Sequence, residues 1–418
     1  MIKTLRNAWK IPDLRKRLLF TLGMLFVFRL GAHIPVPGVN NEALKDLFSQ
    51  GNLLGFFDVV AGGALKDFTI FAMSVTPYIT ASIVIQLLTL IIPSWERMIK
   101  EGGQEGRKKQ MRYTRYATVI LAFIQALAVT LGIRSYLLKQ SWSSYLLIAL
   151  TLAAGTAFLM WLGEKIQEHG IGNGISLIIF TGIISRLPMS VVNMIRKVRL
   201  NEMSIFTVIA IVLGVVVMIA AVILIQEGQR RIPVQYARRV VGRKVVGGQS
   251  THIPLRINQA GVIPVIFASS ILMFPATIAT FSKAAWLKKV GEALQMGGWL
   301  HTILYMLFIF GFTYFYTSVQ FNPRDISDNL KQQGGFVPGI RPGKPTTDYL
   351  SRVSGRLTFV GATFLCALVI IPIVISSAFN IQIGIAGTSL IIMVGVALDT
   401  VKQIENQLMM RHYGGFLK

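Results

Sequence analysis

Ten apolar runs dominate the sequence, and each is about as long as a helix that crosses a lipid bilayer. Met73 to Ile92, for example, is a stretch of 20 residues without a formal charge, and about 20 apolar residues span the hydrocarbon core. Only 14% of all residues are charged, against about 25% in soluble proteins. The sequence therefore predicts an all-α polytopic membrane protein with ten transmembrane helices. The predicted spans are 19–37, 73–92, 114–133, 145–163, 173–190, 205–226, 258–281, 299–321, 357–379 and 384–401.

The distribution of charge predicts how these spans are oriented. The chain has 42 Lys and Arg residues against 18 Asp and Glu residues, a net charge of +24. Most basic residues fall in the segment 1–18 and in alternate loops, and basic loops of membrane proteins face the cytoplasm. Both termini are therefore predicted to be cytoplasmic, with a first span that is retained because no small-residue cleavage site follows it. The basic residues Arg186, Arg196, Lys197 and Arg199 of an outer loop do not fit this rule.

A basic loop at 226–257 divides the spans into two groups of five. Because five is an odd number, the second group enters the membrane from the opposite side. This geometry is typical of an inverted repeat with a pathway between its halves, so we expect two inverted five-helix halves around a central pore. The chain is predicted to begin with a cytoplasmic tail at 1–18 and a first half at 19–190. Residues 191–257 comprise an outer loop, span six and the basic loop. Residues 258–401 comprise spans seven to ten, with a cytoplasmic loop at 322–356, and a cytoplasmic tail follows at 402–418.

The segment before the second span, at about 56–71, is apolar but too broken to cross the membrane. Unsatisfied backbone groups and charges are unfavourable in contact with lipid. Two interpretations fit this pattern. One is a short helix that plugs a protein-lined cavity, and the other is an interfacial helix in a surface loop. The residues that interrupt the segment are Asp58, Gly62, Gly63, Lys66 and Asp67.

An aliphatic stripe follows in the second span. Val75, Ile79 and Ile83 recur every four residues, which places them on one face of a helix. Such a stripe is most often used for helix packing. The functional alternative is a hydrophobic constriction, because aliphatic rings close pores against water and ions by dewetting. The same ring would make few specific contacts with a passing chain, so that many different side chains could pass through it.

The sequence carries no recognisable motif for catalysis, nucleotide binding or metal binding. GIRPGKPTT, which starts at Gly339, lacks the spacing of a phosphate-binding loop, and GIGNG at 170–174 opens a membrane helix. The five His residues show no metal-ligand spacing. The single cysteine, Cys366, excludes an internal disulfide and is predicted to be a small core residue. We therefore expect a protein that is not an enzyme and that needs no cofactor.

Ionisable residues are scarce inside the predicted spans. Arg29 and Asp399 are the main exceptions, while Arg115 and Glu164 lie at span edges. Ion-coupled transporters usually need carboxylates or His residues within the membrane. Their scarcity argues against a secondary transporter of a small solute, which stays as one alternative. A second alternative is a ribosome-docking membrane protein without a pore.

Two loops, 226–257 and 322–356, combine basic residues with Gly, Pro and aromatic residues. The first alternates polar and apolar residues around Ile232, Val234 and Tyr236, which indicates a hairpin. Loops of about 30 residues are usually functional or disordered. We interpret the pair as a shaped docking surface outside the membrane, with a solvated charge run as the alternative.

Long motifs throughout the chain resemble the bacterial SecY family, the central subunits of the Sec protein-conducting channel. This resemblance implies a channel for the secretion of unfolded polypeptides and for the lateral insertion of membrane proteins. A lateral gate would open between spans two and three on one side and spans seven and eight on the other. The motifs are RLLFTLGMLFVFRLGAHIPVPG, AGGALKDFTIFAMSVTPYITASIVIQLLT, MWLGEKIQEHGIGNGIS, QRRIPVQYARR, THIPLRINQAGVIPVIFASS, FNPRDISDNLKQQGGFVPGIRPG and AGTSLIIMV.

The resemblance also implies roles for individual residues. The pore ring would consist of Val75, Ile79, Ile179, Ile266 and Ile392. The plug would include Phe57, Asp58, Gly62, Gly63 and Leu65. A polar cluster that sets gating would consist of Asp58, Gln86 and Asn173, and the docking loops would act through Arg243, Lys244 and Arg341. Two residues depart from the family pattern: Val75 replaces the usual Ile, and Asp58 replaces an amide.

The resemblance implies macromolecular partners, and the net positive charge adds anionic lipids. SecE would brace the two halves, SecG would bind peripherally, and the SecA ATPase or the ribosome would dock on the basic loops. Contact with ribosomal RNA would use the same basic residues, and anionic lipids would bind the cytoplasmic face. The transported partners would be signal sequences and nascent polypeptides, and the location would be the bacterial cytoplasmic membrane.

Overall fold

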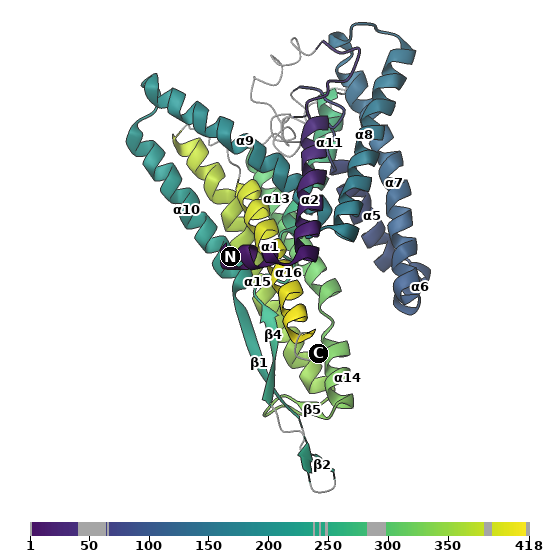
Figure 1. Ribbon diagram of the computed structural model, residues 1–418, viewed down its shortest axis with the longest axis vertical. Coiled ribbons are helices and arrows are strands. Elements are labelled where there is room, and N and C mark those ends of the chain that lie inside the picture. The colour runs from purple at the N-terminus through teal and green to yellow at the C-terminus, as the bar shows by residue number, and fades with distance from the viewer. Residues whose placement is uncertain are drawn as a thin grey trace.

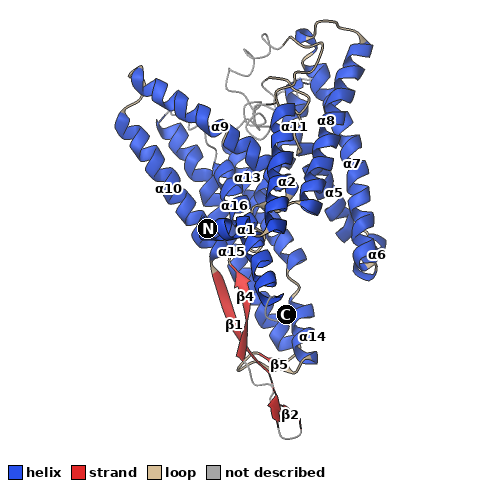
Figure 2. Cartoon of the chain, viewed as in Figure 1, coloured by secondary structure: helices blue, strands red, loops and turns tan. Residues whose placement is uncertain are grey.

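The computed structural model describes residues 2–40, 64, 67–236, 239–241, 244–246, 250–281, 298–379 and 387–414. These residues form a long, mainly helical body from which a small group of strands protrudes at one end (Figure 1). Figure 2 shows that the strands are confined to this protrusion. The first helix, α1 (Ile2–Lys10), and the end of the last, α16 (Gly387–Gly414), lie toward the strand-bearing end.

The first half of the helical body runs from α2 to α9. Pro93 ends α5 and begins α6, because proline removes a backbone donor and clashes with the preceding turn. The two helices meet at a bend of 102°. The elements are α2 (Pro12–Gly31), α5 (Thr76–Ile91), α6 (Pro93–Glu101), α7 (Gly103–Gly132), the 3-10 turn η1 (Arg134–Tyr136), α8 (Trp142–His169) and α9 (Gly174–Arg199).

The second half runs from α10 to α16 and carries the strands. Its helices also cross the body (Figure 1), and residues of α14 and α15 pack against the strands. The elements are α10 (Ile205–Glu227), β1 (Gln229–Tyr236), β2 (Arg239–Val241), β3 (Lys244–Val246), β4 (Ser250–Arg256), α11 (Ile263–Phe281), α13 (Trp299–Gln320), α14 (Pro323–Gln332), β5 (Gly335–Phe336), α15 (Lys344–Phe379) and α16.

Every predicted span falls on a helix. Among the described residues, seven helices are long and apolar enough to cross a membrane, or eight if the bent pair of α5 and α6 counts as one span. The described apolar part of α11 is shorter, and α2 carries four basic residues that lower its hydropathy. Several helices start earlier than the apolar runs: α7 begins at Gly103 and α15 at Lys344. The first turns of both helices are polar and therefore did not belong to the apolar runs.

The protrusion joins the two basic loops that the sequence analysis treated separately. β1 pairs with β4 in an antiparallel ladder and, on its other edge, with β5 from the second loop. The alternation around Ile232 and Val234 predicted this hairpin, and both side chains are buried. They pack with apolar residues of α14 and α15, including Leu330 and Leu350, in one small core. The hairpin prediction is therefore confirmed, and the two loops form one folded unit.

Two apolar clusters form the core of the helical body. One lies mainly in the first half and includes Phe28, Val75 and Ile79, and the other lies mainly in the second half. Ile266 of α11 packs against both clusters. α11 also contacts α5 and α7 of the first half, so the seam between these helices is closed. The two halves therefore meet through a continuous apolar contact.

Candidate functional site

Four of the five predicted ring residues line one small cavity at the junction of the halves. Ile79, Ile179, Ile266 and Ile392 surround a space of about 20 Å³, together with Ile183. The four come from α5, α9, α11 and α16, two helices from each half. A cavity of this size holds about one water molecule. The aliphatic constriction is therefore closed in this structure.

Val75 occupies a different place from the other four. It lies one turn before Ile79, immediately before α5, and its side chain is fully buried in the same apolar cluster without lining the cavity. Ile83, one turn beyond Ile79, is also buried in this cluster. The stripe of the second span thus serves packing at both ends and faces the cavity at Ile79.

Five residues with hydroxyl side chains also line the same cavity, and the sequence motifs did not point to them. They come from three of the four helices that contribute the isoleucines. Each lies three or four residues from an isoleucine of the constriction, on the side away from the strands. That spacing is the signal that could have revealed them, since residues three and four apart share a helix face. The hydroxyl residues are Thr76, Ser269, Ser270, Thr388 and Ser389.

A larger polar cavity of about 230 Å³ lies on the strand-bearing side of the constriction. Ser176, Ile263 and Val396 line it, and each lies three or four residues from an isoleucine of the constriction on the same helix. The two cavities therefore follow one axis, separated by about one helical turn. The polar lining of the larger cavity consists of Asn173, Ser176, Gln226, Arg256, Asn258, Gln259, Gln320, Asp399, Thr400 and Lys402.

Charged residues of both signs line this polar cavity. Arg256 and Lys402 both act electrostatically on the carboxylate of Asp399. Lys402 also forms an ion pair with Glu227 at the end of α10, with a distance of 3.6 Å between Nζ and Oε1. Asp399, one of two charged residues noted inside the spans, therefore lines a polar cavity close to compensating cations.

α9 is common to both cavities and is held closely against α8. A Cβ atom on Gly174 would collide with the carbonyl oxygen of Gly163, so the first turn of α9 needs glycine to approach this closely. Asn173 caps the helix, and its Oδ1 accepts a hydrogen bond from the backbone N–H of Ser176 at 3.3 Å. Capping of this kind fixes where a helix begins. The position of Ile179 in the constriction depends on this start.

Two of the three residues of the predicted gating cluster, Gln86 and Asn173, lie in the described part of the chain. Gln86 donates from Nε2 to Ser82 Oγ at 3.2 Å, within α5. Asn173 bonds within its own helix and lines the polar cavity. The third member, Asp58, lies outside the described residues. The gating role of these residues remains a prediction.

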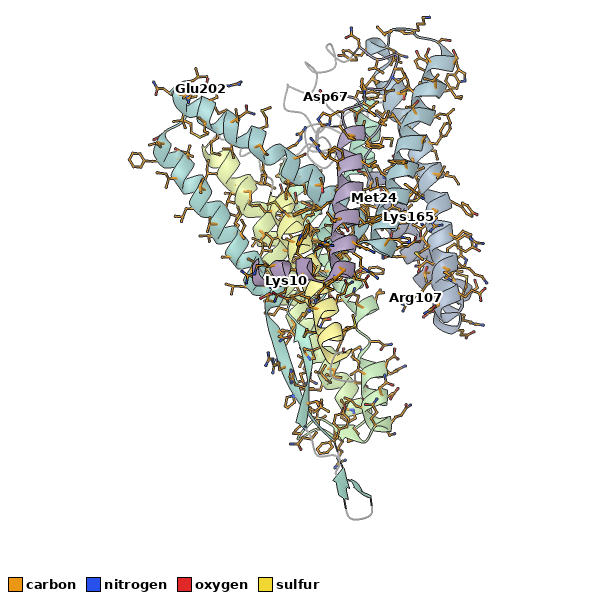
Figure 3. The ribbon with its side chains drawn as sticks, in the orientation of Figure 1. Lys10, Met24, Asp67, Arg107, Lys165 and Glu202 are labelled. Atoms are coloured by element: carbon orange, nitrogen blue, oxygen red, sulfur yellow. The ribbon has the colours of Figure 1, made fainter. Side chains whose placement is uncertain are left out.

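The predicted plug residues Phe57, Asp58, Gly62, Gly63 and Leu65 lie outside the described residues. The segment that follows them, from residue 67, bonds to the residues after α2. The backbone N–H of Val36 donates to Phe68 O at 3.0 Å, and that of Ile70 donates to Ile34 O at 3.0 Å. Phe71 is buried and stacks on Phe28 of α2. Figure 3 places Asp67 toward the end of the body opposite the strands. The connection into α5 is thus anchored in the first half on that side.

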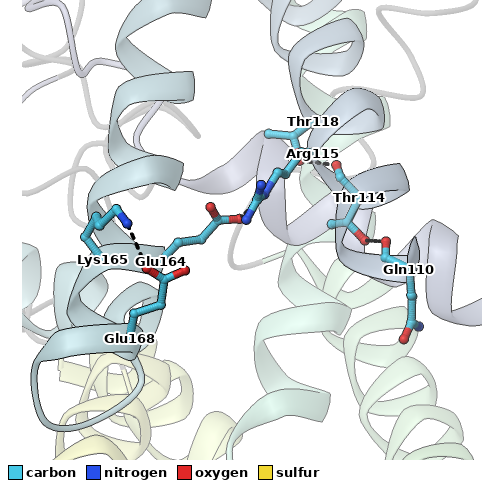
Figure 4. Close-up of polar contacts among 7 residues, drawn as sticks. All are labelled: Gln110, Thr114, Arg115, Thr118, Glu164, Lys165 and Glu168. Atoms are coloured by element: carbon cyan, nitrogen blue, oxygen red, sulfur yellow. Dashed lines mark hydrogen bonds and ion pairs between the residues drawn. The ribbon is translucent and has the colours of Figure 1, made fainter. Parts of the chain in front are cut away.

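Two of the other charged residues near the membrane join neighbouring helices. Arg115 of α7 donates from Nε to Glu164 Oε1 of α8 at 2.7 Å (Figure 4). Arg29 of α2 donates from Nη1 to Ser185 Oγ of α9 at 3.1 Å. Both contacts connect helices of the first half. A packing role accounts for these residues without invoking a transport site.

Two of the three predicted docking residues, Lys244 and Arg341, lie in the protrusion. Arg341 is exposed in the loop between β5 and α15, and its carbonyl oxygen accepts a hydrogen bond from Thr346 Oγ1 at 2.9 Å. Gly339 and Gly343 on either side have positive φ angles of 81° and 97°, which shape the loop and favour glycine. Lys244 lies in β3, and Arg243 is outside the described residues.

Comparisons with known proteins agree on one family. The family model described as SecY matches residues 69–401. The chain is 48% identical to the protein translocase subunit SecY of Halalkalibacterium halodurans and 45% identical to that of Thermotoga maritima, with all of this chain and 98% or more of each relative covered.

Solved structures show the same fold. A protein conducting channel superposes with a TM-score of 0.68 at 17% identity, and Sec61 in the canine ribosome-channel complex does so with a TM-score of 0.64 at 16% identity. In both cases 96% of each chain is covered. The predicted fold class, a polytopic all-α protein with two helical halves around a pore, is confirmed.

Proposed function

This chain belongs to the SecY family, and we propose that it conducts unfolded polypeptides through the constriction formed by Ile79, Ile179, Ile266 and Ile392. The observation that carries this proposal is the location of the constriction between the two halves. A change in the angle between the halves would widen or close it without unfolding either half. The aliphatic surface would accept many side chains because it makes no specific polar contact.

The same geometry supports lateral insertion of apolar segments. α11 contacts α5 and α7, and this seam separates the constriction from surrounding lipid. Parting these helices would let an apolar segment leave sideways, because transfer of its side chains into lipid is favourable. We place the lateral gate at this seam.

The proposed orientation puts the strand-bearing protrusion and both termini in the cytoplasm of a bacterial cell, with the chain in the plasma membrane. The positive-inside rule supports this arrangement, and so does the position of α1 and the end of α16 toward the protrusion (Figure 1). The polar cavity then faces the cytoplasm and receives the polypeptide, while the proposed plug lies on the outer side.

The protrusion is the proposed docking site for the ribosome and for the SecA ATPase. Arg341 is exposed there, and guanidinium groups bind phosphate or carboxylate with two parallel hydrogen bonds. A structural relative is Sec61 in a ribosome-channel complex, which supports a ribosome as partner. SecE and SecG are proposed as further subunits. Energy for transport would come from these partners, since the chain itself is proposed to have no enzyme activity.

Crosslinking tests this function directly. A cysteine at Ile79, in a Cys366→Ala background, should crosslink to a stalled secretory chain, and only when that chain carries its signal sequence. Ile209→Cys is the control, because Ile209 is exposed on the outer surface of α10. If crosslinks formed only from cysteines at Arg243 or Arg341, the protein would be a docking protein without a pore.

A further inference from the structure

The hydroxyl groups beside the constriction form a feature that transport through an aliphatic ring does not explain. We call Thr76, Ser269, Ser270, Thr388 and Ser389 the hydroxyl collar. They line the same cavity as the isoleucines. All lie on the side of the isoleucines that faces away from the strands, which is the outer side in the proposed orientation. α9 contributes Ile183 at this level in place of a hydroxyl.

Thr388 is the member of the collar that points most clearly to a ligand. Its side chain is 6% exposed, and its Oγ1 has no hydrogen-bond partner in the structure as described. Threonine hydroxyls elsewhere in these helices bond to the carbonyl four residues earlier, as Thr400 does with Val396 O at 2.7 Å. Thr388 lies in the first turn of α16. A buried hydroxyl without a partner is unfavourable, which indicates that it has a partner in the working state.

The burial of its neighbours strengthens this point. Ser270 is 5% exposed and Ser389 is 3% exposed, so both side chains are buried beside the cavity. Ser269 differs from them, because its Oγ already donates to Ile266 O at 2.8 Å and can only accept a further bond from a ligand. The cavity of about 20 Å³ has room for one water molecule. In the idle channel, the collar would hold this water on the outer side of the isoleucines.

A translocating polypeptide presents a matching chemistry. An extended chain has no internal backbone hydrogen bonds, and each N–H and C=O group that leaves water needs a partner. The isoleucine side chains offer no hydrogen-bond partner. They separate the collar from the polar cavity by about two helical turns, roughly 10 Å, which corresponds to about three residues of extended chain.

From this arrangement we infer that the hydroxyl collar is a binding site for the polypeptide backbone as it leaves the constriction. A hydroxyl both donates and accepts hydrogen bonds, so the collar serves N–H and C=O groups of any sequence. It limits the stretch of backbone that passes without partners to the thickness of the isoleucine layer. The inference rests on the proposed function of the constriction and adds the exit-side residues to it.

The test compares two threonines in proteoliposomes that hold the complete channel and its driving ATPase. Thr388→Val removes a hydroxyl of the collar and keeps the side-chain shape. Thr313→Val is the matched control, since Thr313 is 2% exposed in α13 and its hydroxyl already donates to Ile309 O at 2.6 Å. We expect Thr388→Val to transport a secretory precursor about fivefold more slowly, the effect of one hydrogen bond. Thr313→Val should stay within twofold of the unsubstituted channel.

Thermal unfolding separates this role from a structural one. Thr388→Val should leave the unfolding midpoint unchanged or raise it, because its hydroxyl has no partner to lose, whereas Thr313→Val should lower it. Thr388→Ser should restore the transport rate. Equal transport rates for Thr388→Val and the unsubstituted channel would contradict the proposed role of the collar but not the proposed role of the constriction. A channel that moved no precursor at all would overturn both proposals.

Discussion

The two cavities on the central axis differ in size and lining although they lie about one helical turn apart. The strand-side cavity measures about 230 Å³ and is lined by amides and charged groups such as Arg256 and Asp399. The constriction encloses about 20 Å³ between isoleucines and hydroxyls, without a charged residue in its lining. Both are built by α9, α11 and α16. The same helices therefore make a wet compartment and a barrier.

The difference between the two cavities indicates which of them seals the idle channel. Water and ions are stable in a polar cavity, but they are unfavourable between the aliphatic side chains of the isoleucine layer. The constriction should therefore control permeability, while the polar cavity should tolerate substitution. Mutations that make the constriction polar, compared with similar mutations in the polar cavity, test this difference most strongly.

The largest effect is expected for polar residues in the barrier. Ile179→Asn combined with Ile392→Asn would allow a continuous file of water through the constriction. Ion leakage through idle channels in proteoliposomes should rise by at least about tenfold, because a dewetted gap becomes wet. Val396→Asn in the polar cavity, one turn from Ile392, is the control and should change leakage by less than about twofold. Equal leakage from both variants would remove the distinction between the two cavities.

A smaller effect is expected at the start of α9, the helix that the cavities share. Gly174→Ala places a Cβ atom against the carbonyl oxygen of Gly163 and must shift the helix. Overpacking of this kind usually destabilises by about 1–3 kcal/mol, so the thermal unfolding midpoint should fall. Gly214→Ala is the matched control, because nothing lies within 4 Å of a Cβ at this glycine in α10. An unchanged midpoint for Gly174→Ala would show that α9 is free to move.

Much of the fold could be predicted from sequence because bilayer thickness fixes the length of apolar runs. Each of the ten runs falls on a helix, and alternation around Ile232 and Val234 marked β1. The pairing of β1 with β5 could not be predicted, since it joins residues about 100 positions apart and local patterns carry no information about such contacts. The early starts of α7 and α15 were missed because their first turns are polar.

The site was predictable only in part. Resemblance to a family indicated four isoleucines that do line one cavity, and helix periodicity alone could not distinguish Ile79, which faces that cavity, from Val75 and Ile83, which are buried in packing. The hydroxyl collar escaped notice because single Ser and Thr residues are common in membrane helices. Their significance depends on the convergence of three helices, which is a property of the fold.

The most direct test of the barrier is thiol labelling at two positions of α9 that are one turn apart. Ser176 lines the polar cavity and Ile179 lines the constriction. Each would be replaced by cysteine in a Cys366→Ala background, and a membrane-impermeant reagent would be added to the cytoplasmic side of idle membranes. We predict rapid labelling of Ser176→Cys and labelling of Ile179→Cys that is at least about tenfold slower. Equal labelling rates would contradict the account, because water would then reach through the isoleucines.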